Sequence, residues 1–222
     1  MNRMVIVLGA LAVAAPLAAQ QQQAKDKDPT KDVAAAPLPA GWSMRLDPKD
    51  ATKTAKFVTM GSGYHVTSGG AAIYYNPKDV VTGDYTVSAT FAQSKPSGHE
   101  GYGIFVGGSK LQDESQSYVY FLVRPSDGKF LINHRAGNDV HKVVDWTANP
   151  GLVQQDSTGK ATNTLAIRVV KDSVHFIANG KEVKAFSKAD MHGFDVGGQA
   201  GLRINHNLDV HIASFTVTPG AK

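Results

Sequence analysis

The chain has 222 residues, a formal net charge of +4 at pH 7, 42% hydrophobic and 19% charged residues, and no cysteine. The absence of cysteine excludes a disulfide scaffold, thiol catalysis and thiolate metal sites. The 23 lysines and arginines are spread along the sequence, which is typical of a solvated surface and does not indicate a nucleic-acid partner.

The N-terminus has the pattern of a secretory signal. Arg3 supplies a positive charge, Met4 to Ala15 form an apolar run, and small residues follow up to Ala19. This order predicts a signal peptide over residues 1–19 and export to the periplasm or the extracellular space. The apolar run is shorter than the about 20 residues that cross a bilayer, so we expect no membrane span.

Residues 20–40 change composition to Gln, Lys, Asp, Ala and Pro, with almost no side chain suited to a core. This composition predicts a flexible linker. The alternative is a helix over residues 24–36, which Pro29 and Pro37 interrupt. We expect one folded domain over residues 41–219, beginning near Trp42.

Beyond Trp42, apolar residues recur at every second position. Tyr85, Val87, Ala89 and Phe91 alternate with polar residues, and Tyr102, Ile104 and Val106 follow the same period. A period of two predicts strands with one face toward a core.

Turn residues divide these runs into hairpins. The best hairpin signals are Pro125 to Gly128 between two apolar runs and Asn179-Gly180 inside a later meander, because Asn-Gly turns require positive φ at both central residues. We expect a last pair of strands over residues 200–205 and 208–217, one helical turn over residues 188–192, and a long connection over residues 146–162. About ten strands and no long amphipathic helix predict an all-β, two-sheet antiparallel sandwich.

Four segments carry a resemblance to a known superfamily: GYGIFVGG, YVYFLVRPSDGKFLINHR, NTLAIRVVKDSVHFIANGKEV and GQAGLRINHNLDVHIASFTV. Their order resembles the concanavalin A-like lectin and glucanase jelly rolls, and within them laminin G-like domains and secreted bacterial 3-keto-disaccharide hydrolase domains. The resemblance implies a jelly-roll sandwich with a concave sheet that often faces sugar. This fold hosts lectins, hydrolases and adhesion modules, so it does not by itself define an activity.

The carboxylates do not match a glycosidase strand. The laminarinase-like enzymes of this superfamily carry two Glu and one Asp on alternate residues of one strand, because acid and nucleophile must flank one bond. Here the three glutamates are Glu100, Glu114 and Glu182, and no strand has two carboxylates on one face. The N-S-G and E-V-Q-I-L-D segments of the keto-disaccharide branch are also missing. We therefore expect no catalytic residues, although carboxylates distant in sequence are able to converge in space.

One run of alternating residues provides candidate binding residues. If Val119, Phe121 and Val123 face the core, Tyr118, Tyr120 and Arg124 lie on the opposite face of the sheet, where they suit sugar stacking and hydroxyl recognition. The alternative is an aromatic ladder that shields the sheet. On the neighbouring strand, His134 and Arg135 point to opposite faces, and we place His134 with the tyrosines.

The polar stretch from Arg203 to His211 provides the other candidates. Arg203 and Asn205 are expected on one face, beside a turn at His206-Asn207, and the alternative is that these polar residues only build the turn. Asp209 is a candidate ligand for a structural calcium ion, although no D-x-D-x-D-G loop is present. Trp146 either stacks on a ligand or covers the end of the sandwich, and we favour the cover.

These patterns together predict an exported, noncatalytic carbohydrate-binding domain. The two alternatives are a glycoside hydrolase of the 3-keto-disaccharide type and an envelope protein-interaction or structural module. The predicted ligand-binding residues are Tyr118, Tyr120, Arg124, His134, Arg203 and Asn205. A carbohydrate or glycan is the expected partner, and apart from the candidate calcium ion no cofactor is expected.

Overall fold

The computed structural model describes residues 37–191 and 193–220. The expected signal peptide and the first seventeen residues of the expected linker lie outside the described residues. Within the described part, none of the helical segments has the length and apolar character needed to cross a bilayer.

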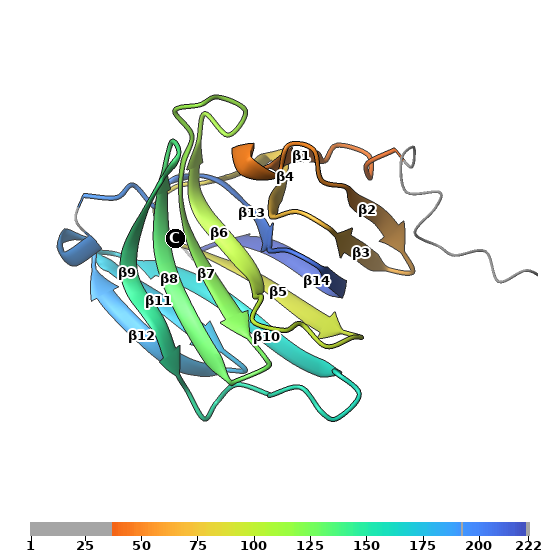
Figure 1. Ribbon diagram of the computed structural model, residues 1–222. Coiled ribbons are helices and arrows are strands. Elements are labelled where there is room, and N and C mark those ends of the chain that lie inside the picture. Colours follow the sequence, from red (N-terminus) through yellow and green to blue (C-terminus); the bar gives the residue numbers. More distant parts are fainter. Residues whose placement is uncertain (1–36, 192, 221–222) are drawn as a thin grey trace, which may run out of the picture. The chain divides into compact units, whose positions relative to one another are not determined.

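Strands dominate the described residues, as the period of two predicts (Figure 1). In chain order they are β1 Ser43–Leu46, β2 Ala55–Met60, β3 Gly63–Ser68, β4 Ala72–Val81, β5 Tyr85–Gln93, β6 Tyr102–Ser109, β7 Ser117–Arg124, β8 Lys129–Ala136, β9 Asp139–Ala148, β10 Ala161–Val170, β11 Ser173–Ala178, β12 Lys181–Ser187, β13 Gly198–Ile204 and β14 Leu208–Pro219. The 3₁₀ turns are η1 Pro48–Asp50 and η2 Ala189–Met191.

The strands form two antiparallel sheets of seven strands each. Sheet A has the order β1-β4-β13-β6-β7-β8-β9, and sheet B has the order β12-β11-β10-β5-β14-β3-β2. Figure 1 shows sheet A in front of sheet B, with the meander β6 to β9 facing the viewer. The all-β, two-sheet jelly-roll prediction is confirmed.

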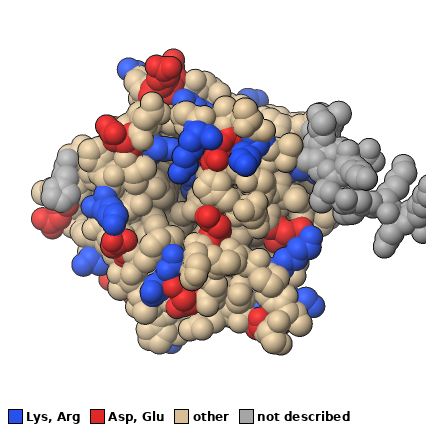
Figure 2. All heavy atoms as spheres, in the orientation of Figure 1, with Lys and Arg blue, Asp and Glu red and all other residues tan. Residues whose placement is uncertain are grey.

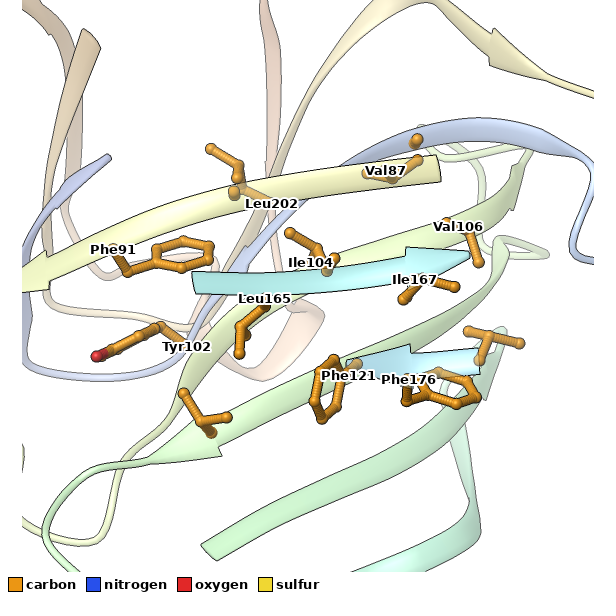
Figure 3. Packing of buried hydrophobic residues seen from close by; sticks show 14 of the residues in the cluster. Val87, Phe91, Tyr102, Ile104, Val106, Phe121, Leu165, Ile167, Phe176 and Leu202 are labelled. Atoms are coloured by element: carbon orange, nitrogen blue, oxygen red, sulfur yellow. The ribbon is translucent and has the colours of Figure 1, made fainter. Parts of the chain in front are cut away.

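The main core fills the space between the sheets (Figure 3). On β5 the residues alternate strictly between buried and half-buried, and Val87, Ala89 and Phe91 are fully buried against sheet A. Phe121 of β7 contacts Phe176 of β11 edge to face, with ring centroids 5.6 Å apart. The alternation seen in the sequence therefore identifies the core-facing side chains correctly.

The predicted turns also have the expected backbone geometry. Asn179 and Gly180 have φ values of 51° and 76°, and Asn207 has a φ of 53°. The Asn179 side chain adds contacts that the turn alone does not need: its Nδ2 donates to the Gly151 carbonyl at 2.9 Å, and its Oδ1 accepts from the Thr164 amide at 2.8 Å.

The strands that the sequence pattern missed are β1 to β4 and β9. β9 is an edge strand whose residues are all exposed or half-buried, so it lacks the alternation of a one-sided strand. Both ends of the expected connection over residues 146–162 are therefore strand, because β9 continues to Ala148 and β10 begins at Ala161. β4 is apolar in its first half and polar in its second, which hides its period.

The outer face of sheet A carries a second buried cluster instead of a solvated surface. It consists of Ile73, Tyr75, Phe105, Leu111, Tyr118, Tyr120, Leu122 and Leu131, with Trp146 packed against it. Gly103 and Gly201 occupy the same face of the central strands, and a Cβ at Gly103 would overlap the carbonyl oxygen of Phe121. The bare backbone at Gly103 leaves room beside it for Arg203, its partner on β13.

Candidate functional site

Strand β7 presents its side chains to two different clusters. Val119, Phe121 and Val123 are in the main core, whereas Tyr118 and Tyr120 lie on the outer face. The predicted division of β7 into two faces is therefore confirmed.

The two tyrosines differ in access. Tyr118 is 1% exposed and packs between Phe105 and Tyr120, at ring-centroid distances of 5.1 and 5.7 Å. It belongs to a buried aromatic ladder, which was the alternative interpretation. Tyr120 lies next along the ladder and lines an open cavity. Burial raises the pKa of its hydroxyl, although Arg203 and Asn133 act in the opposite direction, so Tyr120 is neutral.

The placement of His134 beside the tyrosines was wrong. His134 pairs with Val119 and therefore lies on the core side of β8, where its ring stacks on Phe194 with centroids 3.8 Å apart. Its Nε2 is 2.8 Å from Ser117 Oγ. Burial and the nearby His141 lower the pKa of His134. Arg135 takes the predicted place, directly across from Tyr118.

Two arginines converge on one buried carboxylate on this outer face. Arg203 Nη1 and Nη2 lie 2.6 and 2.7 Å from the two oxygens of Asp47, and Arg135 Nη2 lies 2.8 Å from Asp47 Oδ2. Burial alone would raise the pKa of Asp47, but the hydrogen bond and charge of Arg203, with the charge of Arg135, lower it to about 2. The group is therefore ionised at neutral pH, with two guanidinium ions on one carboxylate.

These residues form the floor of a cavity of about 250 Å³ on the outer face of sheet A. Figure 2 shows lysine and arginine side chains gathered beside a hollow near the middle of this face, with acidic side chains close by. The lining residues are Asp47, Lys49, His99, Glu100, Tyr120, Leu122, Leu131, Arg135, Val140, Trp146, Arg203, Asn205 and His206. We call this the sheet A cavity.

Three of the six predicted binding residues meet there: Tyr120, Arg203 and Asn205. Arg124 lies beside the cavity, because its guanidinium stacks 4.2 Å from the ring of Trp146 and is held by Asp127 at 2.6 and 2.9 Å. Trp146 itself is half-buried on β9 and lines the cavity, so the interpretation of Trp146 as a cover for the end of the sandwich was wrong.

A histidine joins two carboxylates at one side of the sheet A cavity. His206 Nε2 is 2.7 Å from Asp50 Oδ2, and His206 Nδ1 is 3.3 Å from Glu100 Oε1. Burial alone would raise the pKa of Asp50, but the Ala71 amide and His206 lower it. Both ring nitrogens of His206 therefore face carboxylates. The acids that no single strand carries do converge here from distant segments.

Asp209 lies on the outer face of the other sheet, across from Thr67. Ser94 Oγ is 2.6 Å and His65 Nε2 is 3.2 Å from its Oδ1, and Lys95 Nζ is 3.1 Å from its Oδ2. These surroundings do not fit calcium, which requires six to eight oxygen ligands, because two of the three neighbours are nitrogen groups. Among the described residues, no group of three or more His, Asp and Glu side chains is arranged to hold a metal ion.

The residues that sequence reasoning missed come mainly from loops. Asp47, Lys49 and Asp50 are on the segment around η1, and His99 and Glu100 precede β6. No period marks a loop residue as facing a cavity. Arg135 had a usable signal, because the antiparallel register that starts at the Pro125 to Gly128 turn places it opposite Tyr118.

A larger cavity of about 560 Å³ opens near the start of β5 and β13, beside Val80, Phe194 and Asp195. We prefer the smaller one as the candidate site because it brings an indole, a tyrosine and two arginines together, which is the combination of apolar wall and convergent polar groups typical of ligand sites.

Comparison with solved structures defines the class of fold. The chain is similar to the carbohydrate-binding module CBM66 from Bacillus subtilis, with a TM-score of 0.58 and 12% identity over 82% of this chain and 99% of that one. It is also similar to a protein of unknown function with a galectin-like fold from Bacillus subtilis, with a TM-score of 0.60 and 13% identity over 80% and 89% of the two chains.

A third similar structure is a family 16 endo-glucanase from Bacteroides ovatus, with a TM-score of 0.57 and 6% identity over 79% of this chain and 94% of that one. The chain thus has the concanavalin A-like jelly-roll fold that these neighbours share. Searches against family models and against curated proteins find no match.

Proposed function

We propose that this protein binds carbohydrate in the sheet A cavity without cleaving it. The observation that carries the proposal is the meeting of Trp146 and Tyr120 with Arg203 and Asn205 in one cavity on the outer face of a jelly-roll sheet. An aromatic ring stacks on the apolar face of a pyranose, and guanidinium and amide groups hydrogen-bond the hydroxyls around its rim.

The cavity is also preorganised. Asp47 holds the guanidinium groups of Arg203 and Arg135, and Arg124 stacks on the indole of Trp146. Side chains that are fixed before the ligand arrives lose little conformational entropy on binding, which supports affinity in a small site. The names of the similar structures, a carbohydrate-binding module and a glucanase, support a sugar as the ligand.

The chain's tryptophans offer a direct test. It has two, and Trp42 packs among Phe57, Tyr64 and Phe215, away from the outer-face cluster. In a Trp42→Phe variant, Trp146 is the only indole, so its fluorescence should respond to titration with cell-wall and plant oligosaccharides. Calorimetric titration of the unaltered protein gives the affinity, and Trp146→Ala should weaken it.

The matched control is Val153→Ala, which removes an exposed apolar side chain outside the cavity. If neither the fluorescence titration nor the calorimetric titration shows binding to any glycan of the panel, this function is ruled out. If Trp146→Ala leaves the affinity unchanged, the binding site lies elsewhere on the molecule.

The convergence of Asp50 and Glu100 on His206 favours glycoside cleavage as a second candidate function. One imidazole separates the two carboxyls, so they fall within the about 10 Å that spans acid and base in inverting glycosidases. Of the two acids Glu100 lines the cavity and Asp50 is buried behind His206, so in that scheme Glu100 meets the leaving oxygen and Asp50 positions His206. Release of sugar from keto-disaccharides or simple glycosides, abolished by Glu100→Gln, would replace the binding proposal with this one.

We also propose that the protein is exported, on the signal-peptide pattern of residues 1–19. Cell fractionation with N-terminal sequencing of the exported chain tests this, and a full-length chain in the cytoplasm would contradict it. The envelope-structural alternative is less well supported, because the outer face of sheet A offers a polar cavity rather than a bare apolar patch.

A further inference from the structure

A second cavity adjoins the sheet A cavity. It has a volume of about 280 Å³ and is lined by Pro48, Lys49, Arg135, Asn138 and Val140. Three of these residues, Lys49, Arg135 and Val140, also line the sheet A cavity. The two cavities therefore lie side by side, and we call them together the groove; each part has room for one small group such as a single sugar unit.

The two charged residues that line the second cavity are both cations, Lys49 and Arg135. Lys49 is exposed and forms no direct ion pair with a described residue, although its charge helps to lower the pKa of the neighbouring Asp50. Arg135 is 7% exposed and pairs with Asp47, but Arg203 engages both oxygens of that same carboxylate. The lining of the second cavity therefore has two cations and no acid.

The sheet A cavity, in contrast, has acids as well as cations in its lining. Glu100 lines the sheet A cavity beside His206, and the Asp50 carboxylate lies on the other side of that imidazole. Two carboxylates around one histidine repel an anion, whereas Lys49 and Arg135 attract one. The charge of the two linings therefore differs, so a ligand with a negative group at one end is expected to place that end in the second cavity.

We propose that the ligand is an acidic glycan: a neutral sugar unit lies against Trp146 in the sheet A cavity, and the anionic group of the adjoining unit binds Lys49 and Arg135 in the second cavity. This inference rests on the proposed function and specifies its substrate class. A carboxylate or a sulfate ester would form charge-assisted hydrogen bonds with the guanidinium, and the ammonium would add a point charge.

The test is a titration of the full chain against matched oligosaccharides: a neutral galactan, oligogalacturonate as the carboxylated form, and a sulfated galactan, together with an array of other neutral and acidic glycans. We expect acidic glycans to bind at least about tenfold more tightly than neutral ones at low salt, and the difference to shrink as salt is raised. The carboxylate and sulfate arms show which anion the groove prefers.

The variants are Lys49→Ala, Lys49→Glu and, as the matched control, Lys181→Glu at the edge of sheet B. Lys49 and Lys181 are both exposed, so these substitutions should leave folding intact. Lys49→Ala should weaken acidic glycan binding by about two- to fivefold, as expected for a partly exposed ion pair. Lys49→Glu should weaken acidic glycan binding further and by more than it weakens neutral glycan binding, because Lys49 lines both cavities, whereas Lys181→Glu should leave the binding of both glycans unchanged.

The outcomes separate the two proposals. Equal affinity for neutral and acidic glycans, or a Lys49→Glu effect that is absent or equal for the two, overturns the acidic-glycan inference and leaves carbohydrate binding in place. No binding of any glycan on the array overturns both. A larger loss of acidic than of neutral glycan binding in Lys49→Glu supports both.

Discussion

The strongest prediction concerns the carboxylate that Arg203 and Arg135 share. Asp47→Asn keeps the size of the side chain and removes its charge, which leaves two buried guanidinium ions without a counter-ion. We expect the free energy of unfolding to fall by about 2 to 5 kcal/mol.

Two estimates bracket this value. The pKa of Asp47 is lowered from 3.8 to about 2, and a shift of that size corresponds to about 2 kcal/mol of preference for the charged form. Removing one partner of a buried ion pair typically costs about 3–5 kcal/mol, because the remaining charge stays desolvated. The amide of asparagine still accepts one hydrogen bond, so the lower half of the range is expected.

Urea unfolding at pH 7, followed by near-ultraviolet circular dichroism, measures the effect. Asp139→Asn is the control, since Asp139 is exposed at the start of β9 and its side chain has no partner among the described residues. The control should change the free energy of unfolding by less than about 0.5 kcal/mol. If Asp47→Asn is equally neutral, the two arginines are not held by this carboxylate and the preorganised cavity floor is incorrect.

Three further predictions concern the same framework. Because the folded-state pKa of Asp47 lies below its unfolded value, the stabilisation by this carboxylate is present above about pH 4 and is lost as pH falls toward 2. The free energy of unfolding should therefore fall more steeply with decreasing pH in the unaltered protein than in Asp47→Asn. Parallel curves for the two proteins would contradict this. Tyr120→Phe removes the hydroxyl that accepts a hydrogen bond from Asn133 Nδ2 at 3.1 Å. Urea unfolding should therefore show a free energy of unfolding about 1 kcal/mol lower, and an unchanged value would mean that water replaces the contact. Asn179→Gly tolerates the positive φ but loses three side-chain hydrogen bonds, so thermal unfolding should show a loss of stability of about 3 kcal/mol. Asn179→Ala loses the same bonds and also places a Cβ at a positive φ, so it should cost about 1 kcal/mol more. Equal losses for the two variants would refute the backbone argument.

Much of the fold was predictable from the sequence because a strand's side-chain period is a local property. The alternation around Val87 and around Phe121 identified core-facing residues, and Asn179-Gly180 identified a turn, without any knowledge of distant partners. The same local rule placed Tyr118, Tyr120 and Arg124 on the outer face of β7.

Period alone did not decide between His134 and Arg135. It states that neighbours alternate, but the choice of face depends on the register with β7, where Arg135 lies across from Tyr118. It also did not distinguish the ladder residue Tyr118 from the cavity residue Tyr120, because both have the same face and the same chemistry. Access is decided by what covers the sheet, here the segment around η1 and the loop with Leu111.

The sequence by itself determined a two-layer sandwich and the inner and outer faces of its central strands, since both follow from spacing within a few residues. Only the tertiary structure brought Asp47 to Arg203 and Asp50 to His206, each pair 156 residues apart. Contacts of this kind depend on how the chain returns across the outer face of sheet A, and no local period encodes that path. The candidate site consists largely of such contacts, which is why its charge and its floor became visible only in the folded molecule.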